Sequence, residues 1–266
     1  MESRNPAFRG DRFERQAHAY GAPAPQPLNE MYGAPSAPSY APPAGRAMTY
    51  DDVVVKGFMS LATLVLTATL TWVLLPIPTA LAVGVVAFLL QFGIGLYIAF
   101  ANKANAPLVL IFSAVYGVGV GAISHYFNTL YNGVVFQAVV GTALAFAAML
   151  AVYSLRIIRV TPKLTRFVVA AGLALVALML VNLVVGLFND TGIGIRENGP
   201  LGIAFSVIAI LVGCFFLLLD FDNVERGVNA GAPEKFAWYC AFGLVTSLVW
   251  IYLELLRFLS YFAGRD

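Results

Sequence analysis

The sequence predicts an all-α membrane protein, a bundle of seven transmembrane helices that follows an N-terminal tail. The chain has 266 residues, of which 60% are hydrophobic and only 11% are charged, whereas a soluble domain carries about 25% charged residues. Five long stretches contain no Asp, Glu, Lys or Arg: residues 57–102, 104–155, 167–189, 198–219 and 236–253. Because a surface helix of a soluble protein needs a polar face, these stretches indicate a lipid environment.

Seven apolar segments are long enough to cross a bilayer, which takes about 20 residues of helix. They cover residues 53–75, 78–100, 106–126, 133–155, 167–188, 200–224 and 233–262. Thr49, Asp51 and Asp52 precede the first segment and are typical of a capped helix start. Helices are expected because lipid offers no partner for backbone polar groups, and the short alternating strands of a membrane barrel are not found. Small residues that favour close helix packing gather in the second and third segments: Gly93, Gly95, Gly117, Gly119 and Gly121.

Residues 1–50 differ in composition from the rest of the chain. They hold 8 of the 14 prolines, together with alanine, tyrosine and charges of both signs. Such a composition cannot bury a hydrophobic core, and it lacks the apolar run of a secretory signal. We therefore predict a disordered tail over residues 1–50 and a membrane domain over residues 51–266.

The distribution of Lys and Arg predicts the orientation, because cytoplasmic loops are enriched in these residues. The tail carries five arginines, and the connection between the fourth and fifth segments carries four basic residues. On the opposite side, the only basic loop residue is Arg196. We expect a multi-pass protein of the cell (inner) membrane, with a cytoplasmic N-terminus and an external C-terminus. A re-entrant last segment, which would return the C-terminus to the cytoplasm, is the alternative.

Several classes of function are disfavoured by the sequence. The net charge of +2 and the lack of a basic patch with interleaved aromatics predict no nucleic-acid partner. Cys214 and Cys240 lie in apolar stretches, and two cysteines provide no metal framework. The chain has neither a GxxxxGK loop nor an HExxH motif. We therefore expect neither an enzyme nor a bound cofactor, and the sequence assigns no metal ligands.

Asp220 and Asp222 close the sixth segment, in the run LLLDFDNVE. An ionised carboxylate deep in a bilayer costs about 2.5–3.5 kcal/mol on insertion scales, so an acid within a span indicates a functional site. Asp220 lies about 30 Å from the outer end of its helix, near the cytoplasmic interface. Asp222 lies about 200° further round the helix, so we expect one carboxylate to point into the bundle and the other toward water. Two ordinary interfacial carboxylates are the alternative.

Glu254 and Arg257 lie in the last segment. Residues three apart share a helix face, so a local ion pair near the outer interface is the favoured interpretation. A carboxylate that lines an outer vestibule is the alternative. Since Glu254 and Asp220 should lie near opposite membrane faces, we do not expect them to touch.

The C-terminal quarter, LLLDFDNVERGVNAGAPEKFAWYCAFGLVTSLVWIYLELLRFLSYF, resembles the end of the Bax inhibitor-1 (transmembrane Bax inhibitor motif) family. It is most similar to the bacterial, YccA-like members. The aspartate that ends the sixth segment, the polar link and the closing LLRFL carry the resemblance, and SHYFN after a Gly-rich third segment also fits. The resemblance covers residues 50–266 and leaves the tail outside.

This resemblance implies a seven-helix bundle with the last helix at the centre, and the activity of a pH-sensitive calcium leak channel. In the family, two aspartates on the sixth and seventh helices share a proton, and a basic residue after the second helix latches the first aspartate. Asp220 matches the first aspartate, and Lys103 falls near the latch. Ser247 stands in place of the second aspartate and cannot titrate, and Gln91 stands in place of an acid on the second helix.

Two functions follow as hypotheses. The first is a cation leak, for calcium or other cations, in which Asp220 acts as the gate through Lys103 or Ser247 and Glu254 is an outer cation site. The second is a regulator without transport, which binds a protease or another membrane protein through the tail and the loop from Arg226 to Lys235. Both require the lipid bilayer as partner.

Overall fold

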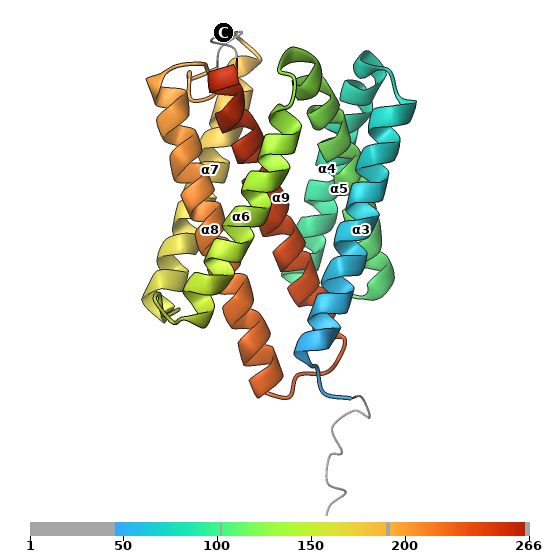
Figure 1. The fold of residues 1–266 in the computed structure, drawn as a ribbon, viewed down its shortest axis with the longest axis vertical. Helices are drawn as coiled ribbons and strands as arrows, with labels where there is room; N and C mark the ends of the chain where they lie inside the picture. The colour runs from blue at the N-terminus through green and yellow to red at the C-terminus, as the bar shows by residue number, and fades with distance from the viewer. Residues whose placement is uncertain (1–45, 102, 190–191, 264–266) are drawn as a thin grey trace, which may run out of the picture. The chain divides into compact units, whose positions relative to one another are not determined.

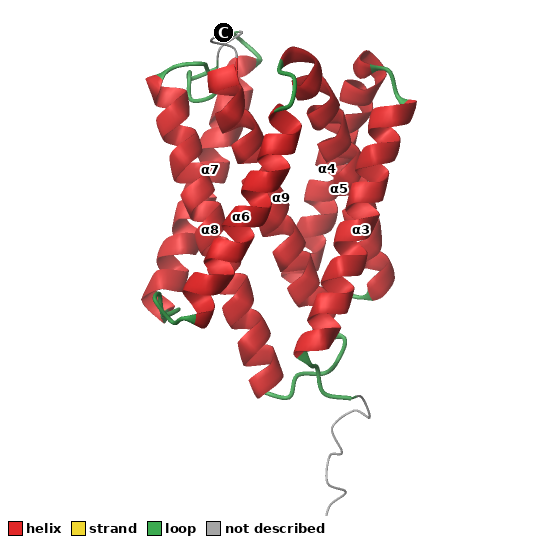
Figure 2. Ribbon diagram, in the orientation of Figure 1, coloured by secondary structure: helices red, strands yellow, loops and turns green. Residues whose placement is uncertain are grey.

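The computed structural model describes residues 46–101, 103–189 and 192–263. Within these ranges the chain forms helices and no strand (Figures 1 and 2): α3 (Tyr50–Leu74), α4 (Ile77–Ala101), α5 (Ala106–Leu130), α6 (Val134–Ser154), α7 (Pro162–Gly186), α8 (Pro200–Asn229) and α9 (Phe236–Ala263). All seven helices are long and apolar enough to cross a membrane, which confirms the predicted fold class. Of the predicted tail over residues 1–50, residues 1–45 lie outside the described residues.

The first described helix begins where a capping box places it. The Thr49 hydroxyl accepts a hydrogen bond from the Asp52 amide at 3.3 Å, and the Asp52 carboxylate accepts one from the Thr49 amide at 2.9 Å. This reciprocal arrangement satisfies two backbone donors that the first turn leaves unpaired. The cap predicted from these residues is therefore confirmed, although α3 begins at Tyr50, three residues before the predicted start.

The fifth predicted segment begins earlier than its charge pattern indicated. The Thr161 hydroxyl accepts a hydrogen bond from the Leu164 amide at 3.2 Å, and Pro162 takes the first helical position, where proline is favoured. The helix therefore starts at Pro162 and not at residue 167, so Lys163 and Arg166 lie in its first turns and not in a loop.

The last helix, α9, lies at the centre of the bundle (Figure 1). It packs against α3, α5, α6 and α8 and buries side chains along most of its length. The principal neighbour of α4 is α5, and that of α7 is α8. The predicted central position of the last helix is confirmed. Four helices form its main contacts, and α4 and α7 pack mainly on α5 and α8.

The chain crosses the bundle seven times without a re-entrant segment among the described residues. α9 is one continuous helix of 28 residues, so the re-entrant alternative is not supported. The described chain begins and ends at opposite ends of the bundle (Figure 1). Below, the N-terminal face is the end at which α3 begins, and the C-terminal face is the end at which α9 finishes.

Close contact between α3 and α5 depends on glycines. A Cβ atom at Gly121 would lie 2.8 Å from the Cα atom of Ala68, and one at Gly117 would meet the backbone of Leu64. Backbones can approach this closely only where side chains are absent. Gly93, by contrast, faces open space, with nothing within 4 Å of its Cβ position. The close packing expected of these glycines therefore holds for Gly117 and Gly121 and not for Gly93.

Replacing Gly121 with alanine should destabilise the bundle, because the added methyl group overlaps Ala68 and overpacking costs about 1–3 kcal/mol. Thermal unfolding of the detergent-solubilised protein measures this change. Gly93→Ala is the matched control, since it adds the same methyl group to open space. Equal unfolding temperatures for the two variants would contradict the packing described above.

Candidate functional site

A polar pair joins α8 to α9 inside the bundle. Asp220 and Ser247 lie 27 residues apart in the sequence, and Ser247 Oγ donates a hydrogen bond of 2.5 Å to Asp220 Oδ2. Ser247 is buried and Asp220 is half-buried. The structure therefore brings together two of the predicted site residues, and the aspartate points at a polar partner instead of the lipid.

A glycine makes room for the carboxylate of this pair. Gly243 lies one turn before Ser247 on α9, and a Cβ atom there would lie 2.6 Å from Asp220 Oδ1. One carboxylate oxygen thus rests over bare backbone while the other accepts the serine hydrogen bond. Both the space at Gly243 and the serine donor therefore come from α9.

Asp222 has a different neighbour from Asp220, as their angular separation predicted. Its carboxylate lies 2.6 Å from the guanidinium of Arg226, one turn along the same helix, and the Arg226 side chain is largely exposed. Exposed pairs at this spacing contribute only about 0.3–0.5 kcal/mol. Asp222 is therefore a partly buried carboxylate with a partner on its own helix, outside the Asp220–Ser247 pair.

Lys103 is not brought to Asp220. It is exposed between α4 and α5 and forms none of the ion pairs found among the described residues. The lysine buried at this face is Lys56 of α3, whose Nζ lies 3.0 Å from Glu234 Oε1 in the α8–α9 linker. The latch through Lys103 stays a prediction, and Lys56 is the lysine that restrains the linker here.

Residues 46–49 close over the α8–α9 linker. The Met48 amide donates to the Ala232 carbonyl at 2.8 Å, and the Glu234 amide donates to the Arg46 carbonyl at 3.0 Å. The Met48 side chain is only 2% exposed and packs in a cluster with Val224 and neighbouring apolar residues. The segment before α3 is thus tied to the linker that connects the helices of Asp220 and Ser247.

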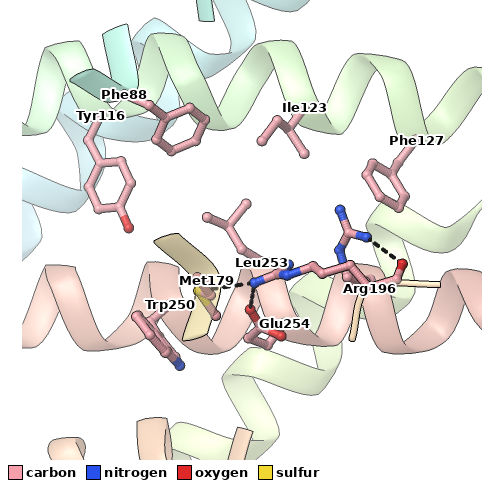
Figure 3. A pocket seen from close by; sticks show the side chains of 10 residues that line it. Phe88, Tyr116, Ile123, Phe127, Met179, Arg196, Trp250, Leu253 and Glu254 are labelled. Atoms are coloured by element: carbon pink, nitrogen blue, oxygen red, sulfur yellow. Dashed lines mark hydrogen bonds and ion pairs between the residues drawn. The ribbon is translucent and has the colours of Figure 1, made fainter. Parts of the chain in front are cut away.

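A cavity of about 250 Å³ lies further along α9, toward the C-terminal face. Among the described residues, no group of three or more His, Cys, Asp or Glu side chains could hold a metal ion. The cavity, called the C-terminal cavity below, is lined mostly by aromatic and aliphatic side chains and by three charged residues (Figure 3): Phe88, Tyr116, Ile123, Phe127, Met179, Trp250, Leu253, Arg196, Glu254 and Arg257.

The predicted ion pair between Glu254 and Arg257 is wrong, because Glu254 pairs with Arg196. Arg196 Nη2 lies 2.8 Å from Glu254 Oε1, while Arg257 Nη1 donates to the Arg196 carbonyl at 3.2 Å and its guanidinium lies over the Phe127 ring. Burial lowers the pKa of Arg196 although Glu254 opposes the shift, and an arginine stays protonated in proteins. Glu254 thus fits the alternative interpretation, a carboxylate that lines a vestibule.

The backbone conformation of the loop between α7 and α8 positions Arg196. Gly192 and Gly194 have φ angles of +62° and +79°, in the left-handed region that favours glycine. The Ile193 amide donates to Asn182 Oδ1 at 3.0 Å, which ties the loop to the end of α7. Arg196 therefore reaches Glu254 from a backbone that is already held in place.

Sequence reasoning did not identify Arg196 or Trp250 as site residues. The one signal for Arg196 was its position as the single basic residue of the loops on its side. Trp250 gave no signal, because it is one apolar residue among many in α9. Its ring N–H donates to the Ala209 carbonyl at 3.0 Å, which fixes one wall of the cavity.

Replacing Arg196 with glutamine should destabilise the protein, because it leaves the buried Glu254 carboxylate without its charged partner, at a cost of about 1–3 kcal/mol. The double variant Arg196→Gln, Glu254→Gln should recover most of this loss, since no unpaired carboxylate remains. Thermal unfolding of the wild type, both single variants and the double variant forms a cycle that isolates the coupling. Additive effects of the two substitutions would contradict the ion pair.

The comparison with known protein families agrees with this geometry. The model of a family described as Bax inhibitor 1 like matches residues 5–264. The match begins at residue 5, so the expectation that the family resemblance leaves the tail outside is wrong. No curated protein matches the chain. With seven helices that can span a membrane and a family match over nearly its whole length, this chain belongs to the Bax inhibitor 1 like family.

Proposed function

We propose that this protein is a pH-sensitive cation leak channel, for calcium or other cations, and not an enzyme. The hydrogen bond from Ser247 to Asp220 carries the proposal, because it holds a carboxylate of α8 against the central helix. The uneven distribution of basic residues supports a cell (inner) membrane location with the N-terminus in the cytoplasm. In that orientation, Asp220 lies toward the cytoplasmic mouth and Glu254 near the outer one.

The chemistry of the Asp220–Ser247 pair gives the direction of the pH response. An ionised carboxylate accepts a charge-assisted hydrogen bond, which is about twice as strong as a neutral one. The pair therefore holds α8 against α9 most firmly when Asp220 is ionised. Protonation weakens the hydrogen bond and releases the contact, so flux should rise as the pH falls. Ser247 does not titrate, so the response depends on protonation of Asp220 alone and not on a proton shared between two carboxylates.

Glu254 and Lys103 complete the proposed pathway. The buried carboxylate of Glu254 is an outer cation site that ions pass without stable binding, because Arg196 already occupies it in this arrangement. Lys103 stands at the same face as the α8–α9 linker and is the alternative partner of Asp220 after the serine bond is broken. Asp222, in its pair with Arg226 on the same helix, is left outside the pathway.

The Asp220→Asn variant should leak calcium at a rate that no longer depends on pH, because an amide cannot ionise and resembles the protonated gate. Purified protein is reconstituted in liposomes that hold a fluorescent calcium indicator, and flux is measured against pH. Asp222→Asn is the matched control, the same change two residues away in a carboxylate that pairs with Arg226, and should keep the wild-type profile. If Asp220→Asn left the pH dependence of the flux unchanged, Asp220 would not be the gate.

Two further variants separate the alternative partners of Asp220. Ser247→Ala removes the hydrogen-bond donor and should raise calcium flux at neutral pH toward the acid level. Lys103→Gln should leave neutral-pH flux unchanged if serine alone holds the closed gate. If Lys103→Gln raised the neutral-pH flux and Ser247→Ala did not, Lys103 and not Ser247 would hold the gate closed.

A second candidate function is that of a membrane regulator that binds a protease or another membrane protein. One observation favours it: residues 46–49 hydrogen-bond to the α8–α9 linker, so a partner that binds the preceding segment would act on the helices of Asp220 and Ser247. Lys56 and Glu234 lie in the same contact and would transmit that force.

Removing residues 2–44 should then lose a membrane-protein partner while the bundle stays folded, since Met48 and its cluster are retained. Affinity purification from membranes of the source cells, with the full chain and with this truncation, measures the difference. A truncation that keeps every partner and its calcium flux would eliminate the regulator as the main function.

A further inference from the structure

The carboxylate of Glu254 is buried, only one of its oxygens has a hydrogen-bond partner, and the residue lines the C-terminal cavity. The residue is 4% exposed, and Oε1 receives the Arg196 hydrogen bond. Among the described residues, no donor lies within hydrogen-bond distance of Oε2. A charged oxygen without a partner in an apolar cavity is costly, so this atom marks a place where a further donor would be bound.

The walls around this carboxylate are suited to an organic cation. Phe88, Tyr116, Phe127 and Trp250 line the same cavity (Figure 3). Aromatic faces attract ammonium and guanidinium groups, more strongly where water is excluded. The volume of about 250 Å³ is far larger than a metal ion needs, and it leaves space for an apolar body beside the charged group.

Arg196 shows which kind of group the carboxylate accepts. Its guanidinium lies 2.8 Å from Glu254 Oε1 and 5.7 Å from the centre of the Phe205 ring. The backbone of its loop is held independently, through Asn182 and through Arg257. The side chain can therefore leave the carboxylate by rotating about its own bonds, without unfolding the loop.

We propose that the C-terminal cavity is a binding site for an organic monocation, a primary ammonium or guanidinium group on an apolar body, which displaces the Arg196 side chain from Glu254. The ligand donates to both carboxylate oxygens and lays its apolar part against the aromatic walls. Arg196 then turns toward the C-terminal face, and its side chain is already 24% exposed in the present arrangement.

Charge and donor count distinguish this ligand from calcium and from an anion. Exchanging one monovalent cation for another keeps the charge of the cavity unchanged, whereas a divalent ion adds positive charge beside Arg257. Calcium takes 6–8 oxygen ligands, and among the described lining residues only Glu254 supplies a carboxylate. An anion would meet the Glu254 carboxylate in the same space. The proposal does not rest on the gate at Asp220, which lies on another helix and has its own partner.

The test is a binding measurement with phenylguanidinium chloride as the probe. The full chain is placed in nanodiscs of phosphatidylglycerol, a lipid without a cationic headgroup, and titrated calorimetrically. Because apparent affinity scales with the fraction of sites free of the competing side chain, Arg196→Gln should bind at least about tenfold more tightly than wild type. Glu254→Gln, alone or with Arg196→Gln, should abolish binding.

Controls fix the site and the ligand class. Arg226→Gln removes an exposed arginine that is not part of the cavity lining and should bind the probe as wild type does. Calcium chloride and sodium benzoate are titrated in parallel and should not displace the probe.

Arg196→Lys is a milder change that replaces Arg196→Gln if that variant does not fold. It should bind the probe with an affinity between those of wild type and Arg196→Gln. Affinity that is unchanged by Glu254→Gln, or calcium that displaces the probe, would overturn the proposal.

Discussion

The hydrogen bond between Asp220 and Ser247 is the contact on which the arrangement of the last two helices depends. It forms only because Gly243 leaves a notch in α9 for the carboxylate. An acid at this depth needs a partner, since lipid offers none, and the partner it has lies on the central helix. The bond thus helps to set the register of α9 against α8, together with the apolar packing between the two helices.

Two polar positions on α9 follow from that register. Ser247 and Glu254 are seven residues apart, which places them on one face and about 10.5 Å apart along the axis. The residues between them are aliphatic or aromatic, and Tyr252 turns its hydroxyl to Ser124 at 2.6 Å. Under the proposed function this apolar interval is the barrier that ions must cross, so a rotation of α9 would move both polar positions together.

The sequence predicted the helices well because charge exclusion over about 20 residues is a strong signal for a membrane span. The start of α7 was placed too late, since Lys163 and Arg166 look like loop residues until the Thr161 cap is considered. Asp220 and Ser247 were paired correctly by resemblance to the family pattern. The partner of Glu254 was predicted wrongly. Helical spacing can indicate Arg257, but it cannot place a loop residue such as Arg196, which is 58 positions away.

The burial of Met48 against the α8–α9 linker has a consequence for how the chain is made. Lys56 and Glu234, which close the same contact, are 178 residues apart, so the partner of α3 emerges from the ribosome only near the end of synthesis. Until then, the methionine and its neighbours remain uncovered at the membrane surface. A nascent chain that stalls before the last hairpin would therefore display this apolar segment, a feature by which quality control could distinguish unfinished copies from complete ones.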